Sequence, residues 1–131
     1  MPVRAIAGPT TMIKVMVLLS RLPGVTREEF KAYYETKHAP LIASLIPSLA
    51  VYRRNYPDVR DARFPSGMND VNFDSVTELA FTDRAGFDAF KRITSDPETL
   101  KIIRADEANF LDHTKTHWFV MEEHSSDLAK P

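Results

Sequence analysis

The stretch MIKVMVLLS, residues 12–20, decides the fold of this chain. It is rich in β-branched and aliphatic residues and short enough to form a single β-strand. Apart from Lys14, both faces of that strand are apolar. Because a strand that is covered on one face only alternates between apolar and polar residues, the stretch predicts a strand with both faces covered.

A helix is predicted to follow this strand. Thr26 and Glu29 have the spacing of a capping box, in which each side chain satisfies an otherwise unpaired amide at the helix start. Helical spacing of apolar residues continues from there through Phe30, Tyr33, Tyr34, Leu41, Ile42 and Leu45. Pro40 lacks an amide hydrogen, so it is expected to kink the helix or end it near His38, with residues 41–46 as a second helical piece.

The rest of the sequence predicts three further strands and two further helices. Apolar and β-branched runs indicate strands at residues 48–57, 74–83 and 115–123. Helical spacing after start signals indicates helices at residues 83–93 and 95–112. With these two consecutive helices counted as one helical unit, the predicted order is strand, helix, strand, strand, helix, strand.

This order is that of the ferredoxin-like fold, an α+β class with a split β-α-β arrangement. Its helices lie on one side of a four-stranded antiparallel sheet and leave the other face bare. A bare apolar sheet would be too large an exposed patch for a soluble monomer. The sequence therefore predicts a twofold homodimer in which two sheets pack face to face.

The remaining segments set the expected boundaries of the domain. Residues 1–11 carry two prolines and a glycine and are expected to form a flexible arm. Residues 124–131 are expected to form a polar tail, which leaves 12–123 as one domain. Residues 57–73 form a long loop with Pro, Gly, Asn and Asp, and loops of this length inside a compact domain are often functional or mobile.

The composition excludes several classes of function. The 131 residues fit one domain, and a net charge of −1 gives no electrostatic reason to expect nucleic acid or a membrane surface as partner. There is no cysteine, so disulfides and thiolate sites are excluded. The apolar run at 12–19 is too short to span a bilayer and does not have the form of a secretory signal, so the cytoplasm is expected. No glycine-rich phosphate motif is present. His113 and His117 are four residues apart but lie in a segment predicted to be extended, so no metal site is expected.

His38 is the strongest candidate for a catalytic residue. Helical spacing places it on the apolar face, four residues after Tyr34 and three before Leu41. A histidine in that position can act as a general acid or base near neutral pH. Tyr34, or alternatively Tyr33, can donate a hydrogen bond to a developing oxyanion. The alternative is that His38 only caps carbonyls that Pro40 leaves free at a helix end.

Other residues are candidates for contact with a substrate. Tyr52, Phe81 and Trp118 are large enough to line a pocket for an aromatic or hydrophobic small molecule, although such residues often belong to the core. His113, next to Asp112 before the last strand, is a further candidate, and a solvated loop histidine is its alternative. Trp118 and His117 are adjacent on a strand, so they face opposite sides of the sheet.

The chain resembles the EthD family of the dimeric α+β barrel superfamily over roughly residues 12–123. The resemblance is carried by "PGVTREEF", "KHAPL" and "DEANFLD". It implies a ferredoxin-like protomer, a sheet-to-sheet homodimer, and a pocket between helices and sheet in which chemistry proceeds without metal or organic cofactor. The histidine of "KHAPL" corresponds to His38, and the acidic residue of the late motif to Asp112. The loop at 57–73 does not match the family pattern.

Relatives of this kind decarboxylate or dehydrate aromatic polyketides, and more distant ones are cyclases, isomerases and cofactor-independent monooxygenases. The resemblance therefore implies a small enzyme without cofactor, acting by proton transfer on an aromatic, polyketide-like or lactone compound, as a lyase or isomerase of aromatic catabolism. Two alternatives stay open. One is a non-catalytic binding or accessory protein, and the other is a monooxygenase of the haem-degrading or quinol-forming type.

Overall fold

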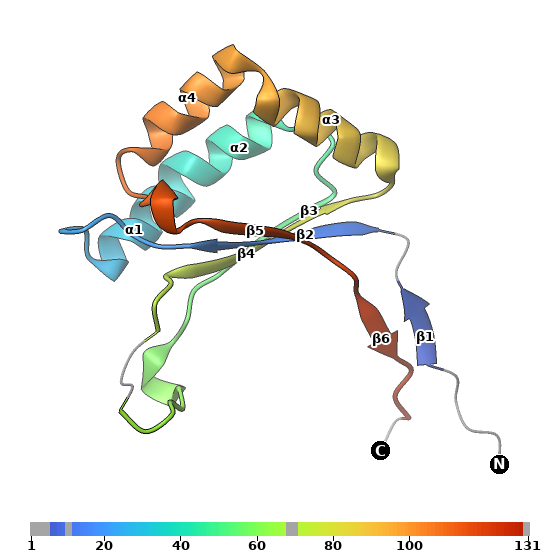
Figure 1. Cartoon of the computed structure of the whole chain (residues 1–131), viewed down its shortest axis with the longest axis horizontal. Coiled ribbons are helices and arrows are strands. Elements are labelled where there is room, and N and C mark those ends of the chain that lie inside the picture. The colour runs from blue at the N-terminus through green and yellow to red at the C-terminus, as the bar shows by residue number, and fades with distance from the viewer. Residues whose placement is uncertain (1–5, 10–11, 68–70, 130–131) are drawn as a thin grey trace.

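The computed structural model of the chain describes residues 6–9, 12–67 and 71–129 (Figure 1). The strands are β1 Ile6–Pro9, β2 Ile13–Leu19, β3 Val51–Asn55, β4 Ser75–Phe81, β5 His117–Met121 and β6 His124–Ser126. The α-helices are α1 Arg27–Tyr33, α2 Ala39–Leu45, α3 Arg84–Ser95 and α4 Pro97–Glu107. A π-helical segment, Tyr34–His38, joins α1 to α2, and short 3-10 turns lie at Val59–Asp61 and His113–Lys115.

A four-stranded antiparallel sheet organises the molecule, with strand order β3-β4-β2-β5. The apolar stretch at residues 12–20 forms β2, one of the two central strands, where Val17 pairs with Thr77 of β4 and Trp118 of β5. All four α-helices lie on one side of this sheet (Figure 1). The predicted ferredoxin-like fold is confirmed.

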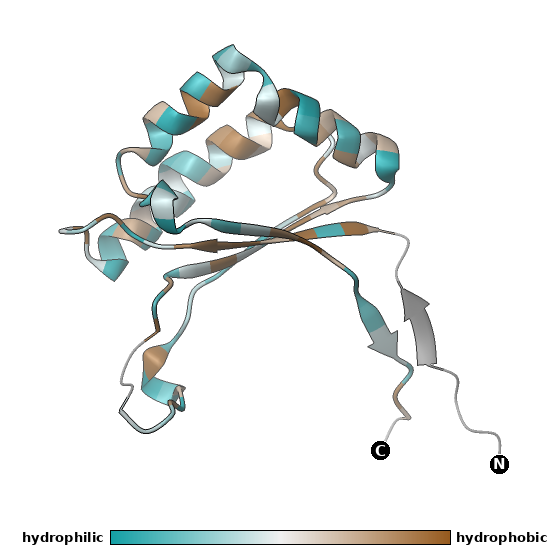
Figure 2. Ribbon diagram, viewed as in Figure 1, coloured by the Kyte–Doolittle hydropathy of each residue, from teal (hydrophilic) through white to brown (hydrophobic). Residues whose placement is uncertain are grey.

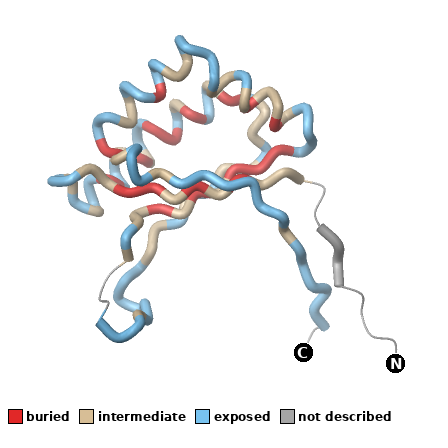
Figure 3. Tube along the Cα trace, in the orientation of Figure 1, coloured by how far each residue is buried: buried red, intermediate tan, exposed pale blue. Residues whose placement is uncertain are grey.

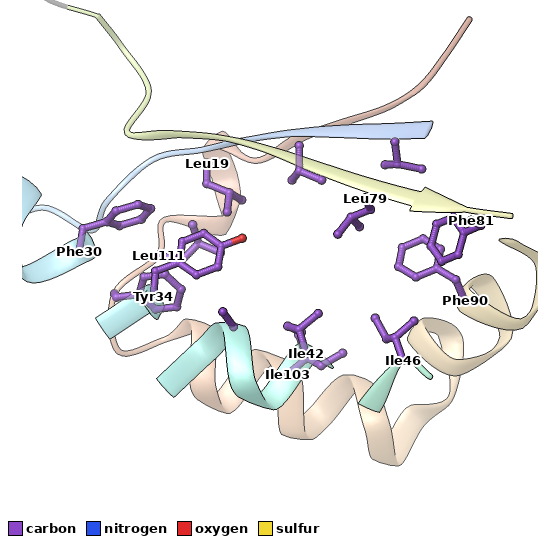
Figure 4. Close-up of a cluster of buried hydrophobic side chains, with 14 of the residues drawn as sticks. Leu19, Phe30, Tyr34, Ile42, Ile46, Leu79, Phe81, Phe90, Ile103 and Leu111 are labelled. Carbon is purple, nitrogen blue, oxygen red and sulfur yellow. The ribbon is translucent and has the colours of Figure 1, made fainter. Parts of the chain in front are cut away.

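The core lies between the helices and the covered face of the sheet (Figure 3). Val15, Val17 and Leu19 of β2 point into it and are buried, because alternate residues of a strand face the same side. Figure 4 shows Leu19 and Leu79 from the strands facing Ile42 and Ile103 from the helices. Figure 2 shows apolar segments, in brown, both along the strands of this sheet and in the helices above it.

The other face of the sheet has no helix over it. Met16 of β2 pairs with Phe119 of β5 and with Glu78 of β4, so these three residues share that open face. Phe119 is 46% exposed. The Glu78 carboxylate accepts a hydrogen bond from Nη1 of Arg53, which supplies the partner that a charge inside a strand requires. Within one chain, therefore, only one face of β2 is covered.

The two end segments differ from the expectation of an arm and a tail. Residues 6–9 form β1, which pairs antiparallel with β6 at residues 124–126 in a separate two-stranded sheet. Residues 1–5, 10–11 and 130–131 lie outside the described residues. The pairing is made by backbone groups between segments with no alternating apolar pattern, so the residue sequence did not indicate it.

Two other boundaries also differ from prediction. The last helix ends at Glu107 rather than near residue 112. Phe110 and Leu111, predicted as part of its apolar face, lie beyond it and are still buried, because Leu111 makes an antiparallel bridge to Arg21 after β2. The long loop after β3 contains the turn Val59–Asp61, and Figure 1 shows it projecting from the side of the sheet opposite the helices. Its residues 68–70 are not described.

Candidate active site

The helix that carries the candidate catalytic residues starts as predicted. The Thr26 amide donates to Oε1 of Glu29 at 3.0 Å, and the Glu29 amide donates to Oγ1 of Thr26 at 3.1 Å. This reciprocal capping box fixes where the first turn begins. Residues further along the helix therefore have defined directions relative to the sheet.

Pro40 alters the helix without ending it. It lies in the first turn of α2, and the preceding segment Tyr34–His38 is π-helical, with the Ala39 amide donating to the Tyr34 carbonyl. Pro40 has no amide hydrogen to continue the regular ladder, so a wider turn costs less at this point than elsewhere. The first and last residues of the wide turn, Tyr34 and His38, are both buried.

A cavity of about 140 Å³ lies between the helices and the covered face of the sheet. Its walls are mostly apolar, as expected of a small-molecule site. The apolar lining consists of Val17, Leu19, Ile42, Ile46, Leu79, Phe90, Ile103 and Trp118. Its polar lining consists of Tyr34, His38, Tyr52, Thr77, Thr94, Glu107 and Thr116.

His38 lines this cavity and is paired with a carboxylate. Its Nδ1 lies 2.7 Å from Oδ2 of Asp106, and the His38 side chain is only 6% exposed. Because an ionised carboxylate can only accept, Nδ1 carries the hydrogen and Nε2 is left as the basic nitrogen. Among the described residues Nε2 has no hydrogen-bond partner. Burial lowers the pKa of His38, and Asp106 opposes that shift.

Asp106 is itself held in place by Tyr33. The Tyr33 hydroxyl donates to Oδ1 of Asp106 at 2.7 Å, and Nδ2 of Asn109 donates to the Tyr33 hydroxyl at 3.0 Å. The ring of Phe110 stacks on Tyr33, with centroids 4.9 Å apart, and its centroid lies 5.0 Å from that of His38. Tyr33 thus fixes the carboxylate behind His38 and does not line the cavity.

Of the two adjacent tyrosines, Tyr33 and Tyr34, it is Tyr34 that faces the cavity. Its ring lies edge-on to His38 with centroids 5.3 Å apart, consistent with their spacing of four residues. The Tyr52 hydroxyl donates to the Tyr34 hydroxyl at 3.2 Å, and the Tyr34 hydroxyl lies 2.9 Å from Oγ1 of Thr77. Thr77 in turn lies 2.9 Å from Oγ of Ser75. Burial raises the pKa values of Tyr34 and Tyr52, so both keep their phenolic hydrogens as donors.

Of the other predicted contact residues, only Trp118 joins Tyr52 on the cavity wall. Trp118 stacks on Phe90 with centroids 6.0 Å apart and is 45% exposed, so it forms a border between the cavity and solvent. Phe81 is fully buried and packs against Phe87 and Phe90 instead. His113 lies in the exposed turn before β5 and does not line the cavity.

Residues 22–114 match the sequence profile of the EthD domain. This chain belongs to the EthD family. The match covers both histidine and carboxylate of the His38–Asp106 pair. A comparison with curated proteins found no match.

Solved structures similar to this EthD protein share its fold. An EthD family protein from Bacillus halodurans superposes with a TM-score of 0.57 at 22% identity, covering 86% of this chain and 98% of that one. A dimeric protein of unknown function with a ferredoxin-like fold, from Bacteroides fragilis, superposes with a TM-score of 0.53 at 16% identity, covering 87% of this chain and 98% of that one. SnoaB from Streptomyces nogalater, a cofactor-independent oxygenase, superposes with a TM-score of 0.54 at 13% identity, covering 87% of this chain and 94% of that one. At these identities the similarity shows the fold alone.

The carboxylate that contacts His38 is that of Asp106. Asp112, onto which the family resemblance maps the acidic residue of the late motif, does not line the cavity. Asp112 accepts hydrogen bonds from the amide and hydroxyl of Thr114, which caps the short turn before β5. A sequence signal for Asp106 was present. It lies three residues after the buried Ile103, so an acidic side chain falls on the inner face of an amphipathic helix. Glu107 and Thr116 also line the cavity and were not predicted.

Within residues 6–9, 12–67 and 71–129, no three His, Asp or Glu side chains come together as a metal would need. No helix among these same residues has the length and apolar character to cross a membrane.

Proposed function

We propose that this EthD protein is an enzyme that transfers protons on a small, largely apolar substrate, with Nε2 of His38 as the general base. The observation that carries the proposal is the His38–Asp106 pair, whose free nitrogen borders an apolar cavity. Buried titratable groups with a charged partner in a cavity are typical of acid–base sites. The substrate class is an aromatic, polyketide-like or lactone compound, and no cofactor is required for this step.

In the proposed reaction, one set of side chains transfers the proton and another stabilises the negative charge. His38 takes a proton from a carbon or hydroxyl of the substrate, and Asp106 stabilises the imidazolium that forms. Tyr34 or Tyr52 donates a hydrogen bond to the substrate oxygen on which negative charge develops, and this hydrogen bond stabilises the charge. In an isomerisation or cyclisation the imidazolium then returns the proton to another atom of the product. In a dehydration the proton goes to the departing hydroxide, which leaves as water. In a decarboxylation the carboxyl proton is the one transferred, and it takes the place at carbon from which CO2 leaves.

Deuterium exchange tests this step without knowledge of the natural substrate. The protein is incubated in heavy water with a panel of phenols, β-dicarbonyl compounds and lactones, and deuterium at carbon is followed by mass spectrometry. We expect exchange above background, reduced by roughly 10²- to 10⁴-fold in His38→Gln. His124→Gln, which alters an exposed histidine paired with Glu122, is the matched control. Equal exchange by wild type and His38→Gln contradicts the proposal.

A cofactor-independent oxygenase is the second candidate. SnoaB, which shares the fold, carries that description, and deprotonation of a phenol by His38 gives the electron-rich anion that such a reaction with dioxygen requires. An oxygen electrode distinguishes it from the first candidate, because only the oxygenase consumes dioxygen. A haemin titration tests the haem-degrading variant. Ligand retention with neither exchange nor oxygen uptake indicates a binding or accessory protein.

We also propose that the protein is a homodimer. The open face of the sheet carries Met16, Leu18 and Phe119, and a structurally similar protein is described as dimeric. A second copy is the partner whose open sheet face has the same shape and composition, and a twofold axis brings the two faces together.

A further inference from the structure

Two polar groups on the cavity wall have no part in the proposed proton transfer. The first is Thr116, just before β5. Its Oγ1 is buried and has no hydrogen-bond partner among the described residues. Thr116 is two residues from Trp118, so both side chains face the helices, and both line the cavity. A buried hydroxyl of this kind keeps its desolvation cost uncompensated until a ligand reaches it.

The second group is the carboxyl of Glu107 at the end of α4. Its side chain is 19% exposed, and the closest described ionic partner is Nε of Arg104, 3.8 Å from Oε1. That distance is too long for a hydrogen bond. Burial raises the pKa of Glu107, Arg104 opposes the shift, and neighbouring Asp106 adds to it. The Glu107 oxygens are therefore available to a ligand in the cavity.

We propose that Glu107 and Thr116 form a second polar subsite of the cavity, which binds an uncharged hydroxyl or carbonyl oxygen of the substrate and orients it toward His38. The cavity measures only about 140 Å³, so one small ligand can meet this subsite and the tyrosine hydroxyls together. The orientation toward His38 rests on the proposed function, whereas the binding itself does not.

The subsite defines a substrate class more narrowly than the apolar walls do. A ligand needs one oxygen for Tyr34 or Tyr52 and a second for Glu107 or Thr116, on a ring that fits the apolar lining. A carboxylate is disfavoured at this subsite, because it would lie close to Glu107 and Asp106 and repel them. Uncharged rings with two oxygen substituents are therefore the class that the geometry favours.

Binding of simple ring compounds measures this preference directly. Trp118 is the single tryptophan of the chain and lines the cavity, so its fluorescence, excited at the red edge of indole absorption, reports occupancy. The probes are phenol and the three benzenediols catechol, resorcinol and hydroquinone. We expect at least one benzenediol to bind about tenfold more tightly than phenol to the wild-type protein.

Paired variants assign the preference to the two residues. In Thr116→Val and in Glu107→Gln, the preference for the benzenediol over phenol is expected to fall at least threefold. The affinity for phenol itself is expected to stay the same. Thr116→Val removes a hydroxyl that has no partner, so the free protein is expected to fold normally. The control variants are Thr94→Val, whose hydroxyl on the same wall already donates to the Phe90 carbonyl, and Glu98→Gln, exposed in the first turn of α4. Both are expected to keep the preference.

The outcomes separate this inference from the proposed function. The subsite is overturned if the wild-type protein binds phenol and all three benzenediols equally, or binds none of them, or if the preference survives in both Thr116→Val and Glu107→Gln. The proton-transfer proposal is overturned by unchanged deuterium exchange in His38→Gln. If the wild-type protein shows the binding preference but no deuterium exchange, the subsite is supported and the proton-transfer proposal is contradicted.

Discussion

Nδ1 of His38 and Oδ2 of Asp106 lie 2.7 Å apart although 68 positions separate them in the sequence. The contact joins the π-helical segment to α4 across the edge of the cavity. It commits one nitrogen of His38 to the carboxylate and leaves the other available to a ligand. The proposed proton transfer rests on this contact.

Replacement of Asp106 tests whether this residue orients His38 and raises its pKa. Asp106 raises the pKa of His38, so in Asp106→Asn that pKa falls further. We expect deuterium exchange to fall by roughly tenfold or more, less than for loss of the base itself. The midpoint of the acid limb of the pH–rate profile is expected to move to lower pH. Asp112→Asn serves as control, and an unmoved profile in Asp106→Asn argues against the pairing.

The two adjacent tyrosines are expected to behave differently. Tyr34→Phe removes a hydroxyl on the cavity wall, and exchange is expected to fall by roughly 10²-fold if that hydroxyl stabilises a developing oxyanion. Tyr33→Phe removes a hydrogen bond to Asp106, so a smaller loss with a shifted pH–rate profile is expected. Rate and pH dependence are measured on both variants. The reverse order of the two losses would assign the oxyanion contact to Tyr33.

The buried His38 makes stability depend on pH. Its folded-state pKa is below the ordinary value of 6.5, so this contribution to stability is fully present above 6.5 and is lost as pH falls through the lower folded-state value. Each unit of difference corresponds to about 1.4 kcal/mol. In urea unfolding, wild type is expected to lose more stability than His38→Gln between about pH 7 and about pH 5. His124→Gln is expected to follow the wild type.

A lower pH range involves a different group. Arg54 forms two hydrogen bonds with Glu35, at 3.0 and 2.8 Å, and with Tyr56 lowers the Glu35 pKa from 4.5 to about 2. Stability from this carboxylate is present above 4.5 and is lost as pH falls toward about 2. The Glu35 side chain is 36% exposed, so about 1 kcal/mol is expected after solvent screening. Glu35→Gln should flatten the unfolding free energy in that range only.

The proposed homodimer predicts that a charge on the open sheet face separates the protomers. Phe119→Asp places a carboxylate opposite Met16, where a second copy would otherwise cover it. We expect light scattering at micromolar concentration to give twice the protomer mass for wild type and the protomer mass for the variant. Ile102→Asp, at a 49% exposed position on α4, is the matched control. A monomeric wild type contradicts the dimer.

The elements and the position of His38 on the inner face of its helix were predictable because their signals are local. The capping box at Thr26 and Glu29 set the helix start, and the spacing of four placed Tyr34 beside His38. Pro40 indicated a departure from regular helix at His38. The form of that departure, a π-turn, depends on how the two flanking helical pieces pack against the sheet, and this cannot be obtained from periodicity.

The partners of these residues were not predictable in the same way. Asp112 appeared as the acidic residue of the site, whereas α4 brings Asp106 to His38 and Asp112 closes a turn. His113 and Phe81, candidates by residue type, lie outside the cavity lining. Residue type indicates what a side chain can do, and only the crossing of helices over the sheet determines which side chains meet.

The sequence by itself determined the order of elements, the apolar β2, the capped helix and the inward direction of His38, since each depends on residues within one or two turns of chain. The tertiary structure decided that Asp106 pairs with His38, that Tyr52 joins Tyr34, and that Glu107 and Thr116 line one cavity. The two hydrogen-bonded pairs join residues that are 68 and 18 positions apart. Hydrophobic packing of helices on the sheet sets them, and no local pattern records that packing.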